Sequence, residues 1–447
     1  MKTVFRRLMV LLSVVMLLAV CAGQPAEAES LPTVTLADAL AQALEHNPLV
    51  LQAGHQAQQA ACEQAAARAD LLPKVRAGYS FTWLEDVRST NIGGVAVPLN
   101  RKDNYAFDVT LSQPLFTGFS LISAYKLATI GLQEAQTREQ LARIELVYQV
   151  KSAYFSLLLA RKMVGVAAEV VTGLASHLRD ARHFYEQGLI PRNDLLQSEV
   201  ELANGEQGYR LAVKEEALIM ARLAVLMQRP RDWRYDVEDV VDVSPVTLDL
   251  AAVTEAAFAE RPELRVANYQ LNMAAQQIVA ARSAYFPQLT FTAQHERIGD
   301  SPDVSGNGIQ NPYETSLMVA ATWDVWDWQK RHSQVKQAQT YQEETRLAFT
   351  QVMDDIGLEV KENFLQVNFS FSNIETTRVR LAQGQENYRI TDLRYKNQLS
   401  TSTEVLDALT LLARVQFDYY KSRYEYHSAL AGLARAIGRD ELFPEGQ

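Results

Sequence analysis

The residues that could carry out chemistry do not form a catalytic or metal-binding pattern. The seven histidines fall on predicted helices or strand ends, without an HExxH pair or a cysteine partner that would indicate a metal site. The sequence contains no G-x-S-x-G elbow and no glycine-rich phosphate loop. These features predict that the protein is not an enzyme and needs no cofactor or metal.

Two pairs of acidic residues are spaced so that both members can act together. Asp324 and Asp327 lie among tryptophans at the end of a predicted strand, where contact with water explains them more simply than catalysis. Glu404 and Asp407, three apart in a predicted helix, share one face of it. A capping role is equally open for Glu404, because residues 401–404 form a capping box and acids are favoured in a first helical turn. Asp407 lies beyond that turn.

Composition excludes several classes of protein. The 447 residues include 43 Lys and Arg against 53 Asp and Glu, and the net charge of −10 argues against a basic face that binds nucleic acid. No apolar run after the N-terminus is long enough for a membrane-spanning helix. With two cysteines, the chain cannot be a disulfide-stapled fold. The low counts of Pro and Gly, 14 and 20, favour long uninterrupted elements.

The N-terminus resembles an export signal. Basic residues precede an apolar segment at 8–20, and Ala-Glu-Ala at 26–28 is a suitable cleavage site, which predicts a signal peptide over residues 1–28. An alternative is a lipoprotein cut before Cys21, but Val20 stands where that cleavage requires a small residue. Either cleavage predicts that the mature protein works outside the cytoplasm.

The chain repeats itself once. Pro262 follows Pro48 by 214 residues in matching surroundings, and Tyr395 follows Tyr185 by 210 in the later part of the repeat. The difference of four residues falls where a loop can absorb it. We therefore predict a duplicated domain, with the first repeat at 29–228, a connector at 229–250, the second repeat at 251–438 and a tail at 439–447.

A very long helix dominates each repeat. No proline occurs from residue 119 to 190, which predicts a helix of about 70 residues and roughly 100 Å. Apolar residues recur in it every seven positions, which indicates helices packed along a supercoiled seam. These positions are Val150, Leu157, Val164, Val171, Leu178 and Tyr185, with the partners Val360, Val367, Ile374, Leu381, Tyr388 and Tyr395. Shorter helices at 36–71 and 193–228 could lie end to end along the first long helix. By itself, this pattern also fits a soluble periplasmic coiled-coil adaptor or scaffold protein.

Two strands precede each long helix, and all four alternate apolar and polar side chains. The predicted strands begin near Val75, Tyr105, Gln288 and Tyr313, and each has about the length of a membrane-barrel strand with one face to lipid and one to water. A soluble sheet with one buried face is the alternative. Aromatic residues at the strand ends favour the membrane, as a girdle at the lipid interface. The girdle residues are Trp83, Trp323, Trp326 and Trp328.

Four strands cannot close a barrel, and an open edge cannot lie in lipid. We therefore predict a homo-oligomer whose subunits share one barrel. Two copies provide eight strands, and side chains fill the interior of a barrel of that size. Three copies provide twelve strands, with room for a channel. The pattern leaves this choice open.

The sequence resembles the TolC family of outer-membrane efflux proteins. The resemblance covers nearly all of the mature chain and rests on the duplicated plan, the proline before each first strand, and the turn segments 185–189 and 395–399. It implies a mainly α protein, in which a shared twelve-stranded membrane β-barrel, four strands per protomer, continues into a long α-helical barrel.

The resemblance also implies a function without catalysis. Such a protein is a homotrimeric, passive exit duct in the lipid of the outer membrane that extends into the periplasm, and it serves tripartite efflux or type I secretion. Its partners are a periplasmic adaptor (membrane fusion) protein and an inner-membrane pump of the RND, ABC or MFS type.

The family's periplasmic tip, which closes like an iris, implies roles for five residues. The carboxylates of Asp194, Glu404 and Asp407 line this aperture, and threefold symmetry turns each into a ring that favours cations and in which neighbouring carboxylates raise one another's pKa. Tyr395 occupies the matching position of the tip tyrosine. Some members place an arginine latch five residues later, where this chain has Ser400.

Overall fold

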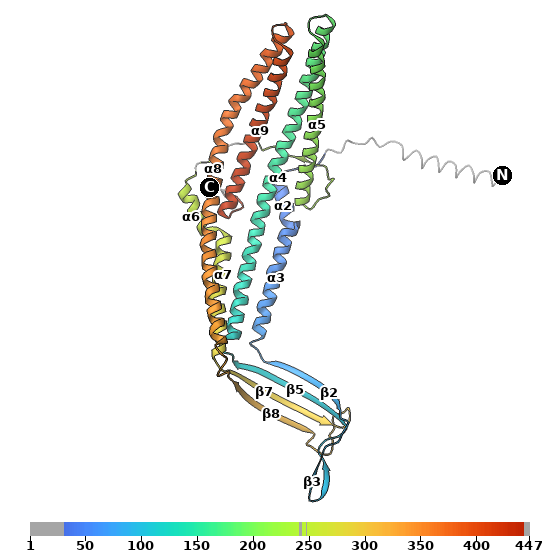
Figure 1. Ribbon diagram of the computed structural model, residues 1–447, viewed down its shortest axis with the longest axis vertical. Coiled ribbons are helices and arrows are strands. Elements are labelled where there is room, and N and C mark those ends of the chain that lie inside the picture. The colour runs from blue at the N-terminus through green and yellow to red at the C-terminus, as the bar shows by residue number, and fades with distance from the viewer. Residues whose placement is uncertain (1–30, 241–243, 247, 442–447) are drawn as a thin grey trace, which may run out of the picture.

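The computed structural model describes residues 31–240, 244–246 and 248–441. The predicted signal peptide, with Cys21, and the last six residues of the predicted tail lie outside the described residues. The described residues form long packed helices with a four-stranded β-sheet at one end, as Figure 1 shows.

The two repeats have the same order of elements. The first contains α2 (Leu36–His46), α3 (Pro48–Ala69), β2 (Lys74–Trp83), β5 (Asp103–Phe116), α4 (Ser120–Glu186) and α5 (Arg192–Leu226). The second contains α6 (Leu250–Glu260), α7 (Pro262–Arg282), the short 3-10 helix η1 (Ser283–Tyr285), β7 (Gln288–Gly299), β8 (Tyr313–Thr322), α8 (Lys330–Lys396) and α9 (Ser402–Ile437).

The predicted long helices are confirmed as α4 and α8, each of 67 residues. A helix of this size is roughly 100 Å long. Helix α3 lies along the part of α4 nearest the sheet and α5 lies along the other part, so the two shorter helices together match the long one (Figure 1). In the described part of the chain, no helix combines the length and the apolarity that crossing a membrane requires.

The prediction of one continuous helix at 36–71 was wrong, because the chain breaks between α2 and α3. Pro48 disfavours the helical conformation of the residue before it, and Asn47 accordingly has an extended backbone with ψ of 130°. The Asn47 side chain accepts a hydrogen bond from the backbone N–H of Leu49 at 2.9 Å and so caps α3. Arg261 and Pro262 break the second repeat in the same way between α6 and α7.

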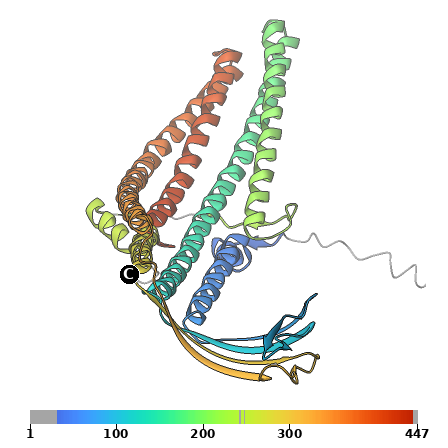
Figure 2. The same ribbon diagram turned by 60° about the horizontal axis from the view of Figure 1, so that its bottom comes forward.

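The four predicted strands form one antiparallel sheet in the order β2-β5-β7-β8. Its register places apolar residues opposite one another across all three pairs of strands, which puts them on one face. Examples are Phe81 opposite Tyr105, Leu111 opposite Ala293, and Phe291 opposite Val319. Figure 2 shows a curved sheet, and β2 and β8 are its unpaired edges.

Two small sheets were not predicted. A hairpin of β3 (Ser89–Ile92) and β4 (Val95–Pro98) lies within the loop between β2 and β5 and extends away from the main sheet (Figure 1). Strand β1 (Thr33–Val34) pairs in parallel with β6 (Asp236–Val237), which ties the start of the first repeat to the predicted connector.

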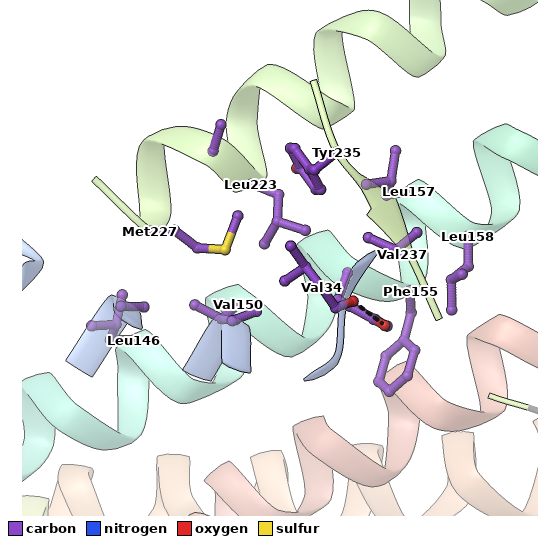
Figure 3. Packing of buried hydrophobic residues seen from close by; sticks show 14 of the residues in the cluster. Val34, Leu146, Val150, Phe155, Leu157, Leu158, Leu223, Met227, Tyr235 and Val237 are labelled. Atoms are coloured by element: carbon purple, nitrogen blue, oxygen red, sulfur yellow. Dashed lines mark hydrogen bonds between the residues drawn. The ribbon is translucent and has the colours of Figure 1, made fainter. Parts of the chain in front are cut away.

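The largest hydrophobic core lies midway along the helices, where α2, α4, α5 and the β1–β6 pair meet (Figure 3). The Tyr154 hydroxyl donates to the backbone oxygen of Glu238 at 2.7 Å, which anchors the connector to α4. Burial raises the pKa of Tyr154 to about 12, so the phenol is neutral at neutral pH. A second cluster packs α6 against α8 and α9, and a small third cluster lies close to the helix ends remote from the sheet.

Candidate functional site

The turns α4–α5 and α8–α9 lie at the same end of the molecule, far from the sheet (Figure 1). We call the first turn tip 1, residues 185–196, and the second tip 2, residues 395–406. The N–H of Leu189 donates to the backbone oxygen of Phe184 at 2.9 Å, and Leu399 makes the equivalent bond to Arg394 at 2.8 Å. Both turns therefore close the end of a long helix with the same backbone geometry.

At tip 2, polar residues form hydrogen bonds at the N-terminus of α9. The Glu404 N–H donates to the Thr401 hydroxyl at 3.3 Å, which confirms that Thr401 caps the helix. The Ser400 hydroxyl donates to the carboxylate of Glu404. This bond, together with a hydrogen bond from the backbone of Thr401 to the same carboxylate, lowers the pKa of Glu404 from its ordinary value, so the carboxylate is charged at neutral pH.

The three carboxylates predicted to line the aperture are exposed or partly exposed in the protomer. Glu404 and Asp407 are both exposed on α9, whereas Val405 and Leu406 between them are buried. Asp194, the repeat partner of Glu404, is partly buried in the first turn of α5. Within the described residues of one protomer, no hydrogen bond or ion pair joins Asp194 to Glu404 or Asp407.

Tyr395 is located differently from the other four predicted residues. It is only 3% exposed, and its ring packs 4.7 Å from the ring of His177 and 5.5 Å from that of Phe184, both on α4. Burial raises the pKa of the Tyr395 hydroxyl, with a further contribution from the charge of Asp180. The tyrosine therefore joins the α8–α9 hairpin to the α4–α5 hairpin.

Four helices meet at a polar contact that the sequence did not indicate. His177 of α4, 2% exposed, is hydrogen-bonded through Nε2 to the Ser402 hydroxyl of α9 at 2.7 Å. The Ser402 oxygen lies 3.4 Å from that of Ser198 on α5, and Tyr395 of α8 completes the group. We call these four residues the hairpin joint. A histidine near a heptad stripe carries no signal of such a role, because the partner helices are far away in sequence.

The four tryptophans predicted as a girdle lie at both ends of the sheet. Trp83 ends β2 at the end remote from the helices, whereas the other three follow β8 at the end nearest them. All four are exposed, and Trp328 reaches 84%. The Trp326 and Trp328 rings meet edge to face with centroids 5.8 Å apart. This arrangement fits aromatic residues at two lipid–water boundaries.

Comparison with known proteins places these features in a family. A family model described as outer membrane efflux protein matches residues 39–226 and 253–439, so the two matched segments correspond to the two repeating halves. The chain is 24% identical over 403 residues to the alkaline protease secretion protein AprF of Pseudomonas aeruginosa, covering 88% of this chain and 82% of that one. It is 23% identical over 397 residues to the toluene efflux pump outer membrane protein TtgC of Pseudomonas putida, covering 83% and 76%.

A solved structure has the same fold. The CmeC outer membrane channel of Campylobacter jejuni superposes with a TM-score of 0.81 over 93% of this chain and 90% of that chain, at 15% identity. The two long hairpins and the exposed sheet therefore belong to a recurring architecture.

Proposed function

This chain belongs to the outer membrane efflux protein family, and we propose that three copies of it close into one passive duct across the outer membrane and the periplasm. The family consists of channel proteins of the outer membrane, and its members are not enzymes. The observation that carries the trimeric duct is the open four-stranded sheet with one apolar face.

The sheet cannot exist in lipid as a single copy, because β2 and β8 leave a row of unpaired backbone groups at each edge. Both edge strands have ten residues, and the alternating order makes β2 of one copy antiparallel to β8 of the next. Closure thus joins edges of matched length with all apolar faces outward. Three copies give twelve strands and a lumen lined by the polar face, whereas two give eight strands, too few for an open channel.

The helices support the same assembly. In the single chain, α5 and α8 expose large apolar side chains along their lengths, and apolar surface of this extent marks an interaction face. Neighbouring copies in a closed ring cover it. These residues include Leu196, Val200, Leu211 and Leu218 on α5, and Leu347, Leu358, Leu365, Phe369 and Leu393 on α8.

We assign the predicted site residues to the two ends of this duct. Asp194, Ser400, Glu404 and Asp407 line the periplasmic aperture, with Tyr395 behind them as part of the hairpin joint. The Trp girdle marks the two lipid boundaries of the barrel. The division into a first repeat at 29–228, a connector at 229–250 and a second repeat at 251–438 belongs to the same proposal.

The partners in this proposal are a periplasmic adaptor and an inner-membrane pump of the RND, ABC or MFS type, which supply the energy that a passive duct lacks. AprF is an alkaline protease secretion protein and TtgC is an outer membrane protein of a toluene efflux pump, which supports export as the shared task. A soluble coiled-coil adaptor is not favoured, because its sheet needs a cover for the exposed apolar face, and the described helices lie away from the sheet (Figure 1).

Cysteine cross-linking between the edge strands tests the trimer. In a Cys62→Ser background, Ser80→Cys on β2 and Ser316→Cys on β8 place one thiol on each edge. We expect oxidation of outer membranes to give a ladder that ends at a covalent trimer. Ser80→Cys with Thr292→Cys on the interior strand β7 is the matched control and should stay monomeric. A ladder ending at a dimer, or a monomer released by lysis without detergent, contradicts the proposal.

A further inference from the structure

The hairpin joint contains a buried group that can change charge near neutral pH. Neutral imidazole suits the present packing, because His177 Nε2 has Ser402 as its partner while the buried Nδ1 has no hydrogen-bond partner among the described residues. A protonated imidazole must donate from both nitrogens. In the closed joint no described residue accepts a hydrogen bond from Nδ1, so the charged form is poorly accommodated.

Charged groups around His177 partly cancel one another. Asp180 lies one turn further along α4, and Asp392 and Lys396 come from α8. The Lys396 ammonium lies 2.8 Å from the Asp392 carboxylate and 4.0 Å from that of Asp180. It therefore reduces the attraction that the two carboxylates exert on an imidazolium.

The other elements at the joint present groups that are neutral or further away. From α8, Tyr388 and Tyr395 have pKa values raised by burial, so they are neutral phenols at neutral pH. From α5, the Ser198 hydroxyl donates to the backbone oxygen of Asp194 at 2.9 Å. The charge of the Asp194 carboxylate contributes to the raised pKa of Tyr395. From α9, the contact is the Ser402 hydroxyl. Burial thus dominates over the carboxylates, and the pKa of His177 is lowered from its ordinary value of 6.5.

We propose that His177 is a proton-operated lock: the neutral side chain holds the α4–α5 and α8–α9 hairpins together, and its protonation releases them near their tips. Release hydrates the imidazole, so the separated state binds the proton more tightly than the closed state. As the pH falls below about 6.5, protonation therefore shifts the equilibrium towards separation. For each pKa unit between the two states, the ratio of separated to closed hairpins can rise up to tenfold. A consequence for transport, an aperture that widens on acidification, rests on the proposed function.

Distances between spin labels on the two hairpins test the lock directly. Arg179→Cys on α4 and Thr410→Cys on α9 are exposed sites, and Cys62→Ser removes the described native thiol. The labelled full-length protein is assembled in detergent with an excess of unlabelled copies, so that distances within one protomer are measured. We expect one distance at pH 8 and an additional longer one at pH 5.5, in a fraction that grows as the pH falls.

His177→Gln removes the titrating group but can still hydrogen-bond to Ser402, so it should keep the pH 8 distance at pH 5.5. The matched control is His427→Gln, because His427 also has a pKa lowered by burial but stacks on Phe155 in the central core. This control should still separate in acid. A wild-type distance that does not change with pH, or a His177→Gln variant that separates like wild type, overturns the proposal.

Ser402→Ala tests the same lock from another helix and serves if His177→Gln fails to assemble. Loss of the hydroxyl weakens the closed state, so separation should begin at a higher pH than in wild type, and an unchanged transition overturns the proposal. Planar-bilayer conductance over the same pH range separates the lock from the aperture. If the label distances respond to pH and the conductance does not, the lock stands and the assignment of the tips as the conducting constriction fails.

Discussion

The two tips have the same backbone turn but differ in what supports it. In tip 1, Gly188 takes the left-handed conformation with φ of 76°, whereas Gln398 takes it in tip 2 with φ of 60°. Tyr185 of tip 1 is 38% exposed, while its repeat partner Tyr395 is 3% exposed and packs on His177. The duplicated sequence therefore preserved the turn and changed its surroundings.

This difference shows how a duplicated chain becomes asymmetric. The α8–α9 hairpin rests on α4 through Tyr395 and the other residues of the joint, and Gln416 of α9 adds a bond to Glu169 at 2.9 Å. Tyr185 makes no equivalent ring contact with any residue that the structure describes, which leaves the outer side of tip 1 open to a neighbouring copy. Within one protomer, tip 2 is thus held by the first hairpin, whereas in the proposed ring tip 1 is held by the next subunit.

The largest effect that tests this comparison is expected from truncating the two tyrosines. Tyr395→Ala removes a buried ring from between two hairpins, and such a loss costs about 3–5 kcal/mol. Tyr185→Ala removes a side chain that is exposed in the protomer, where roughly 0.5 kcal/mol is usual. Hydrogen exchange of the tip amides in the assembled protein measures the free energy of local opening. Similar losses in both variants would show that tip 1 is buried by a neighbour as deeply as tip 2 is buried by its own chain.

An exchange of the turn residues should have a smaller effect of opposite sign at the two tips. A residue with a side chain in the left-handed region carries a penalty of about 1–2 kcal/mol, which glycine avoids. Gln398→Gly should therefore stabilise tip 2, although the freedom that glycine adds to the unfolded chain reduces the gain. Gly188→Gln should destabilise tip 1 by about 1 kcal/mol or more. Hydrogen exchange measures both, and the double variant should lie near wild type in total. A destabilising Gln398→Gly would refute strain at this turn and indicate that the Gln398 side chain is held by a neighbouring copy.

Sequence patterns predicted the elements of this fold because each has a strong local period. The spacing of seven placed the two long helices, and alternation placed the four strands within a few residues. The breaks before Pro48 and Pro262 were missed, although a proline disfavours the helical conformation of the residue before it. The β1–β6 pair was missed because two-residue strands have no period, and their pairing joins segments about 200 residues apart.

The tips were predictable only in part, for a related reason. Glu404 and Asp407 were predicted to share one helix face from their spacing, and in the structure both are exposed. Ser400 was singled out only because some family members have an arginine at this position. Its hydrogen bond to Glu404 could not be predicted, because it depends on the geometry of the turn. His177 was assigned no role, because a joint between α4, α5, α8 and α9 exists only after the hairpins assemble. A single sequence shows the period of a helix but not which of its polar residues meets a partner.

The smallest expected effect concerns the charge that the two tips present to passing ions. Tip 2 carries Glu404 and is followed directly by Asp407, whereas tip 1 carries Asp194 and is followed by Gln197 at the position of Asp407. In a threefold ring, the double variant Glu404→Gln and Asp407→Asn removes six charges and Asp194→Asn removes three. Exposed charges interact only weakly in water, so we expect about a two- to fivefold change in cation-to-anion permeability. Reversal potentials in planar bilayers should show a larger decrease for the double variant than for Asp194→Asn. Equal decreases would place the constriction between the tips, and no decrease would remove these carboxylates from the aperture and leave helix capping as the role of Glu404.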